Sequence, residues 1–242
     1  MKKLVHILAA LAVCTSMLLT ACSNEGGNNN SGSNSGNSAN VNNDNDDSSS
    51  NDNSGDNNGS NGSSSGSVEY SHGSFDENGK YTNKFMGIGA DFDTEEWLSF
   101  DDDYLSSYNG GVSSEEDLKK RVESGSMVYE MMVGKETGSN INVVIQKLGL
   151  SVTEEEYIDY NLEVIEDQLE SNGTMENPHA SKKSVSFAGA SRFALDVEGS
   201  SGELELYERI VAIQRGEYMC MVTITAQSEG EREEFTSIFY GV

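Results

Sequence analysis

The sequence predicts an α+β protein, a single α/β/α sandwich built around a central, mainly antiparallel sheet. Three observations predict this class. Strand-like runs in the second half of the chain are separated by short glycine-containing turns, which favour antiparallel neighbours. Two apolar helical segments begin with Ser or Thr followed three residues later by Glu, a typical helix start. Side chains of residues 218–226 point alternately to the two faces of the predicted strand, and none of them is charged, which indicates that both faces of the sheet are covered.

The first elements of the domain follow Asn78-Gly79, a pair typical of hairpin turns. The alternation after this turn predicts one strand over residues 81–92. Ser114 precedes three acidic residues, which favours a helix start because a cap side chain and negative charge stabilise the first turn. The next elements are expected in the order helix 101–108, helix 114–123, strand 127–133 and strand 141–148.

The clearest helix begins at Thr153, where Thr153 and Glu156 match a capping box. Apolar residues at helical spacing continue from there to the stop signal Asn172-Gly173. A closing helix is expected to begin at Ser228 and to bury Phe239 near its end. Between these two helices the pattern predicts four strands, at residues 184–187, 193–197, 204–213 and 218–226.

The first 22 residues have the parts of a bacterial secretory signal. Lys2 and Lys3 give a positive start, and residues 4–19 form an apolar run interrupted by polar positions. A membrane anchor helix is the alternative, but the run is shorter than the roughly 20 apolar residues that cross a bilayer. Leu19-Thr20-Ala21-Cys22 resembles the lipobox of bacterial lipoproteins. The resemblance implies that the Cys22 thiol receives a diacylglyceryl group, that a peptidase cuts before Cys22, and that two acyl chains tether the mature protein to the membrane.

The composition changes after the lipobox. Residues 23–67 are almost entirely Asn, Ser and Gly with scattered Asp, and they contain no aromatic residue. Such a stretch cannot bury enough apolar surface to offset the entropy lost on ordering. The sequence therefore predicts a signal peptide over residues 1–21, the lipidated Cys22 with a disordered tether over residues 22–67, and one globular domain over residues 68–242.

Charge and cysteine usage exclude several classes of protein. The chain has 15 basic and 41 acidic residues, a formal net charge of −26. This balance disfavours nucleic acid as a partner, because binding to nucleic acid gains from basic patches. Cys14 lies in the predicted signal peptide and Cys22 in the lipobox, so Cys220 has no partner for an intramolecular disulfide. No phosphate-binding or cofactor-binding motif is recognised, and no cofactor is expected.

Few residues are candidates for catalysis or metal binding. Nucleophilic catalysis needs a base beside the nucleophile. Cys220 lies in an apolar alternation that favours a buried hydrophobic role, while His72 is expected at the flexible start of the domain and His179 in a loop. Carboxylates gather between Asp91 and Asp103, where they could hold a hard cation, but their spacing matches no known binding loop. We therefore assign no catalytic residue and no metal ligand.

Trp97, Tyr104 and Tyr108 are the candidates for a small-molecule pocket, because aromatic side chains line many ligand sites. Aromatic residues also form cores. The position of Trp97 near the end of a strand favours packing over recognition. Both interpretations remain open for these residues.

Aromatic and glycine positions with a recognisable spacing lie at the two ends of the domain. They are Gly73 to Phe75, Tyr81, Asn83, Gly87, Trp97, Arg209 to Val211, Gly216 to Tyr218, Val222 to Thr225 and Phe239. These positions resemble those of lipid-anchored proteins of gut Firmicutes that carry a PsbP-like α/β/α domain. The resemblance covers Gly73–Val242 and implies a PsbP-like fold. It implies no catalytic residues, and the namesake of the family is an extrinsic subunit of photosystem II.

These features predict a protein that Cys22 anchors through lipid to the extracytoplasmic face of the cell membrane, on the surface of a Gram-positive cell. We expect a noncatalytic binding or accessory module of the cell envelope, whose partner is an unidentified protein or small molecule. The alternative is an extracytoplasmic hydrolase whose site is not recognisable from the sequence.

Overall fold

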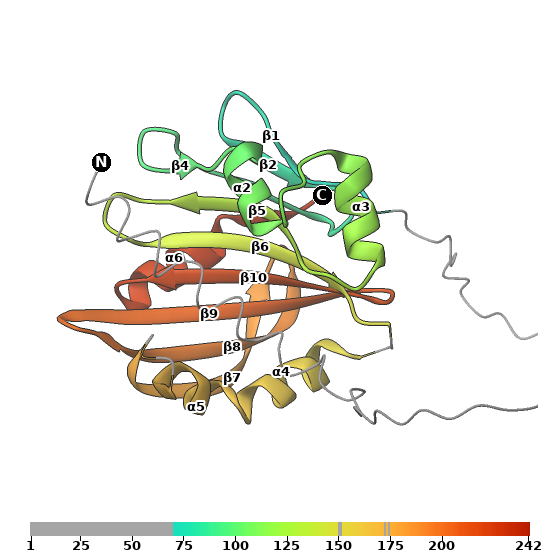
Figure 1. The fold of residues 1–242 in the computed structure, drawn as a ribbon. Helices are drawn as coiled ribbons and strands as arrows, with labels where there is room; N and C mark the ends of the chain where they lie inside the picture. The colour runs from blue at the N-terminus through green and yellow to red at the C-terminus, as the bar shows by residue number, and fades with distance from the viewer. Residues whose placement is uncertain (1–69, 150–151, 172, 174) are drawn as a thin grey trace, which may run out of the picture. The chain divides into compact units, whose positions relative to one another are not determined.

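Seven antiparallel strands form the large sheet of the protein (Figure 1). The computed structural model describes residues 70–149, 152–171, 173 and 175–242, which all lie in one compact unit. The strand order is β4-β5-β6-β10-β9-β8-β7, and every neighbouring pair is antiparallel. The strands are β4 (Leu98–Ser99), β5 (Val128–Gly134), β6 (Asn140–Lys147), β7 (Glu176–Phe187), β8 (Ala190–Ser201), β9 (Leu204–Arg215) and β10 (Tyr218–Ala226).

A second sheet of four strands has the order β1-β2-β3-β11. Its strands are β1 (Ser74–Phe75), β2 (Lys80–Asn83), β3 (Ile88–Asp91) and β11 (Phe239–Gly241). The predicted hairpin turn joins β1 and β2. Gly79 has a φ of +81°, and a Cβ there would lie 2.4 Å from the carbonyl oxygen of Phe92, so the turn requires glycine. The sequence did not predict that these short strands form a separate sheet.

Both faces of the large sheet are covered, as the alternation along β10 predicted. Helices α3 and α6 and the small sheet share one buried cluster with the sheet, while α2, α4 and α5 share the other. Cys220 and Val222 of β10 belong to the first cluster, and Met219 and Met221 belong to the second. The predicted α+β class with a central antiparallel sheet is therefore confirmed. The helices are α2 (Asp102–Tyr108), α3 (Glu115–Glu123), α4 (Glu154–Leu162), α5 (Ile165–Ser171) and α6 (Glu229–Ser237).

The helix starts lie where the sequence predicted them. The Ser114 hydroxyl accepts a hydrogen bond from the Asp117 N–H, and Thr153 with Glu156 forms a capping box. The expected single helix after Thr153 is divided, because α4 ends at Leu162 and α5 begins at Ile165. Between them the Val164 N–H donates to the Asn161 carbonyl at 3.2 Å, a tighter turn than that of an α-helix.

The predicted strand over residues 81–92 is wrong, because a turn divides it into β2 and β3. The Asn83 side chain accepts a hydrogen bond from the Met86 N–H at 2.9 Å, and Gly87 has a φ of 72°. An asparagine that bonds its own backbone a few residues on is a common turn former. The apolar alternation concealed this local signal.

Two other boundaries also differ from the prediction. Strand β7 begins at Glu176, so Pro178 and His179 lie in a strand and not in a loop. This strand is at the edge of the sheet, where proline is tolerated because one row of N–H groups needs no partner. At the other end, Phe239 begins β11 and does not extend the closing helix. There it pairs with Ala90 of β3.

Candidate functional site

The expected lipidation site lies outside the described residues. Cys22, the preceding signal peptide and the tether over residues 22–67 all fall there, so the lipid anchor remains a prediction. In the part of the chain that the structure describes, no helix combines the length and the apolar character that crossing a bilayer requires.

Trp97 lies in the core and is only 7 % exposed. Its ring makes edge-to-face contacts with Phe92 at 5.5 Å and Phe235 at 4.8 Å between centroids. The ammonium of Lys135 lies 4.9 Å from the centroid of the Trp97 ring. Trp97 therefore joins the small sheet to α6 by packing.

Tyr104 and Tyr108 lie together, but on the other side of the large sheet from Trp97. Their hydroxyl oxygens are 3.0 Å apart, and the Tyr104 ring stacks on Phe100 at 4.7 Å between centroids. Both tyrosines pack against the cluster of α2, α4 and α5, whereas Trp97 belongs to the opposite cluster. The three candidates therefore do not form one pocket.

The remaining sequence candidates are also separated. Cys220 is fully buried, and burial raises the pKa of its thiol, which disfavours the thiolate needed for nucleophilic attack. Asp93 and Asp101 of the acidic stretch accept hydrogen bonds from nearby backbone N–H groups in a turn and at the α2 cap. Among the described residues, no three His, Cys, Asp or Glu side chains form a group that could hold a metal ion.

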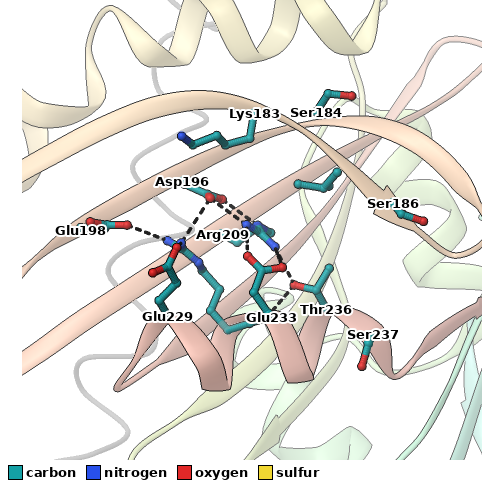
Figure 2. A pocket seen from close by; sticks show the side chains of 12 residues that line it. Lys183, Ser184, Ser186, Asp196, Glu198, Arg209, Glu229, Glu233, Thr236 and Ser237 are labelled. Atoms are coloured by element: carbon teal, nitrogen blue, oxygen red, sulfur yellow. Dashed lines mark hydrogen bonds and ion pairs between the residues drawn. The ribbon is translucent and has the colours of Figure 1, made fainter.

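A polar cleft lies between α6 and strands β7, β8 and β9 (Figure 2). Its volume is about 510 Å³, within the range of small-molecule sites. Strand β7 supplies one wall, β8 and β9 supply the floor, and α6 supplies the other wall. The lining residues are Lys183, Ser184, Val185, Ser186, Asp196, Glu198, Arg209, Glu229, Arg232, Glu233, Thr236 and Ser237.

The floor of the cleft is an ion pair between two strands. Asp196 and Arg209 are direct cross-strand partners, 2 % and 3 % exposed, and both oxygens of Asp196 accept from the guanidinium at 2.7 Å (Figure 2). Glu233 of α6 accepts from the same guanidinium at 2.7 and 2.9 Å. Burial alone lowers the pKa of Arg209, but its bonds and Coulomb attraction to Asp196 and Glu233 outweigh this, so the pKa is raised. The bond from Arg209 in turn lowers the pKa of Glu233. Arg209 is thus a permanent, fully coordinated cation.

Arg232 of α6 lies beside this pair but is held more loosely. Its side chain is 2 % exposed, yet its nearest carboxylate oxygens are at 3.3 Å on Glu198, 3.5 Å on Asp196 and 3.6 Å on Glu229. Its Nε has no hydrogen-bond partner among the described residues. A guanidinium normally donates to carboxylates at about 2.7–2.9 Å. The cleft therefore contains a buried cation with spare hydrogen-bonding capacity.

The sequence predictions did not identify this cleft. Its charged residues come from four elements, β7, β8, β9 and α6, and their side chains meet only in the folded protein. One signal was present, because Asp196 and Arg209 each interrupt a segment that reads as a buried strand. Buried charges need a partner, and only the strand register shows that these two are partners.

A second unexpected feature is a buried carboxylate, Glu130, whose side chain is 0 % exposed. It lies at a break in the β5–β6 register, and such bulges redirect a side chain. Its oxygens accept hydrogen bonds from the Tyr70 hydroxyl, the Gly73 N–H at 2.9 Å and the Asn83 amide at 3.1 Å. The Nδ1 of His72 lies 3.0 Å from the same carboxylate. Glu130 therefore fixes the first described residues to the large sheet, and His72 is not the flexible residue that we expected.

The His72 contact predicts a pH dependence of stability. Burial lowers the pKa of His72, but the hydrogen bond and charge of Glu130, with Asp102 and Glu115, raise it above its ordinary 6.5. A raised folded-state pKa gives stability that is complete below the unfolded pKa and is lost as the pH rises through the folded pKa. We therefore expect the Tm to fall from about pH 6 to about pH 8 more steeply in the wild type than in His72→Gln. Differential scanning fluorimetry measures this.

The matched control for this measurement is His179→Gln, because the His179 side chain is 82 % exposed. Its pH profile should follow that of the wild type. If His72→Gln has the same slope as the wild type, the buried contact with Glu130 does not stabilise the protonated histidine.

Comparisons with known proteins find similarity to solved structures. No protein-family model matches this chain, and no curated protein matches it in sequence. The solution structure of cyanobacterial PsbP (CyanoP) from Synechocystis sp. PCC 6803 is similar, with a TM-score of 0.40 and 11 % sequence identity. The match covers 74 % of this chain and 98 % of that chain.

Proposed function

We propose that this protein is a lipid-anchored, noncatalytic binding module that works on the extracytoplasmic face of the cell membrane. The anchor is Cys22, the tether is the Asn/Ser/Gly segment after it, and the binding site is the polar cleft beside α6. The partner that fits this cleft is a small polar molecule from the cell envelope.

One observation carries the binding function, namely the buried charge at the base of an open cleft. Two arginines and one aspartate line this open cleft, although each of them is at most 3 % exposed. Burying charged groups is unfavourable unless they are paired, and such groups collect at functional sites. The pairing of Arg209 stabilises the fold, whereas the looser contacts of Arg232 leave hydrogen-bonding groups for a ligand.

The noncatalytic part of the proposal rests on the chemistry of the side chains in the cleft. Arginine stays protonated, so Arg209 and Arg232 orient and neutralise a ligand but do not exchange protons with it. The free thiol of Cys220 is buried in the core and does not line the cleft. Binding is therefore the activity that this set of groups performs best.

The anchor is tested by replacing Cys22 with serine and following the protein in membrane and soluble fractions of the producing cell. We expect the wild-type protein in the membrane fraction and labelled by a radioactive fatty acid, because two acyl chains bind a bilayer stably. The Cys22→Ser protein should be unlabelled, because it lacks the thiol that receives the lipid. Cys14→Ser is the matched control and should remain labelled. A labelled Cys22→Ser protein contradicts the anchor.

The binding site is tested with isotope-labelled domain and a soluble extract of the producing cell's envelope. Amide shifts should concentrate at cleft residues such as Ser186 and Ser237, and they should be absent at Ser113, an exposed serine that does not line the cleft. Shifts that avoid the cleft, or no shifts at all, contradict the proposed function.

A further inference from the structure

The innermost charges of the cleft do not balance. Arg209, Arg232 and Asp196 are the buried charged groups that line it, so the interior has one more positive than negative charge. The other carboxylates of the cleft are on exposed side chains, with exposed fractions of 48 % for Glu198, 71 % for Glu229 and 56 % for Glu233. The balancing negative charge is thus supplied by carboxylates on exposed side chains, of which Glu233 is bonded to Arg209 while Glu198 and Glu229 contact Arg232.

Arg232 is where this excess charge is located. Arg209 donates hydrogen bonds to both oxygens of Asp196 and both of Glu233 at 2.7–2.9 Å, so it has no N–H group left for a further carboxylate. The contacts of Arg232 with Glu198 and Glu229 are 0.4 Å or more longer than those of Arg209. These two glutamates hold the places that an external anion would take, and their long, exposed side chains are free to leave.

The wall opposite α6 supplies one further positive group. Lys183 of β7 is exposed and lines the cleft (Figure 2). Ser184 and Ser186 alternate with Lys183 along the strand, so their side chains face the other side of the sheet, where the Ser184 hydroxyl is bonded to that of Ser191.

We propose, on the basis of the binding function above, that the cleft binds a small anion whose carboxylate or phosphate group displaces Glu198 and Glu229 from Arg232. Arginine suits this role because its planar guanidinium donates two parallel hydrogen bonds to a carboxylate or a phosphate. Lys183 adds a second positive charge at the rim.

The net charge of −26 does not prevent this binding. Exposed charges farther away than about 8 Å are largely screened at physiological ionic strength. The groups that matter are those lining the cleft, and among them the displaced glutamates move away from the anion as it binds.

The test uses four sugars of similar size as probes of the isotope-labelled domain, each titrated to about 10 mM, where millimolar affinity is detectable. Glucuronate presents a carboxylate, glucose 6-phosphate a phosphate, glucose no charge and glucosamine a positive charge. We expect saturable amide shifts at Ser186 and Ser237 with at least one of the two anions, and none with glucose or glucosamine. The two anions together show which acid group the cleft prefers.

Two substitutions with opposite effects make the test specific. Arg232→Gln should weaken binding of the preferred anion by tenfold or more. Glu229→Gln should strengthen it severalfold, because it removes a competitor for Arg232. Glu229 is exposed, so this variant folds even if Arg232→Gln does not. Arg215→Gln and Glu217→Gln are the matched controls on an exposed turn outside the cleft and should bind as the wild type does.

Three outcomes would overturn the proposal: no anion shifts the cleft residues, glucosamine binds instead, or Glu229→Gln weakens anion binding. In each case the envelope extract separates the two hypotheses. If the extract still shifts Ser186 and Ser237, the cleft is a binding site for another class of ligand. If it does not, the proposed binding function fails as well.

Discussion

Replacing Asp196 with alanine lowers the free energy of unfolding by about 3–5 kcal/mol, since one partner of a buried ion pair is removed and the other stays buried. Arg209 loses its bidentate contact with Asp196, and Arg232 loses its contact at 3.5 Å. For a domain of this size each kcal/mol changes the Tm by about 2–4 °C, so we expect a decrease of about 10 °C. Thermal unfolding followed by circular dichroism measures it.

Asp159→Ala is the matched control, because Asp159 forms an ion pair of similar length with Lys182 but is 52 % exposed. Its Tm should change by no more than about 2 °C, since exposed ion pairs add little. The double variant Asp196→Leu/Arg209→Met should recover part of the loss, because apolar residues of similar volume often replace a buried pair without cost. If Asp196→Ala is as stable as Asp159→Ala, the pair does not hold β8, β9 and α6 together.

Replacing Glu130 with alanine has the second largest expected effect. It leaves the Tyr70 hydroxyl, the Gly73 N–H and the Asn83 amide without their common acceptor in the interior. Each buried donor without a partner costs about 1–3 kcal/mol, but the Tyr70 hydroxyl keeps a contact with His72 and the Asn83 amide keeps one with Tyr81, so the total loss is about 3–5 kcal/mol. The Tm should fall by about 10 °C.

The loss should begin at the first described residues. Tyr70 is 4 % exposed in the folded protein. A protease that cleaves after aromatic residues should cut Glu130→Ala at Tyr70 before it cuts elsewhere, and mass spectrometry identifies the product. Glu115→Ala, which removes an exposed carboxylate that lines a neighbouring pocket, is the control and should resist cleavage at Tyr70. Simultaneous cleavage throughout Glu130→Ala would mean that Glu130 stabilises the whole fold and does not selectively fix its first segment.

The sequence predicted the elements whose causes are local. Ser114 and Thr153 cap helices through bonds to residues three positions later, so the signal and the structure lie in the same few residues. The alternation along β10 was sufficient to predict that both faces of the large sheet are covered, because two apolar sides require two covering layers. Both kinds of argument depend only on neighbouring residues.

The features that the sequence did not reveal depend on how separate elements meet in the fold. Asp196 and Arg209 form a pair only in the observed register of β8 and β9, and Arg232 reaches them from α6. Glu130 faces the small sheet because a bulge redirects it, and alternation alone does not show a bulge. In each case a charged residue inside a predicted strand was the available signal, and the missing information was its partner.

The pairing of β3 with β11 also limits how early in folding the small sheet can form. Tyr240 and Asp91, which are hydrogen-bonded across these strands, are 149 residues apart in sequence. The small sheet therefore cannot close before β11 is available for pairing, and Phe92 and Phe187, which contact Phe239, stay accessible until then. Contacts of such long range form slowly and leave apolar surface open to aggregation. A chaperone that shields this surface during folding would have its greatest effect on the yield of the protein, and not on the stability of the folded state.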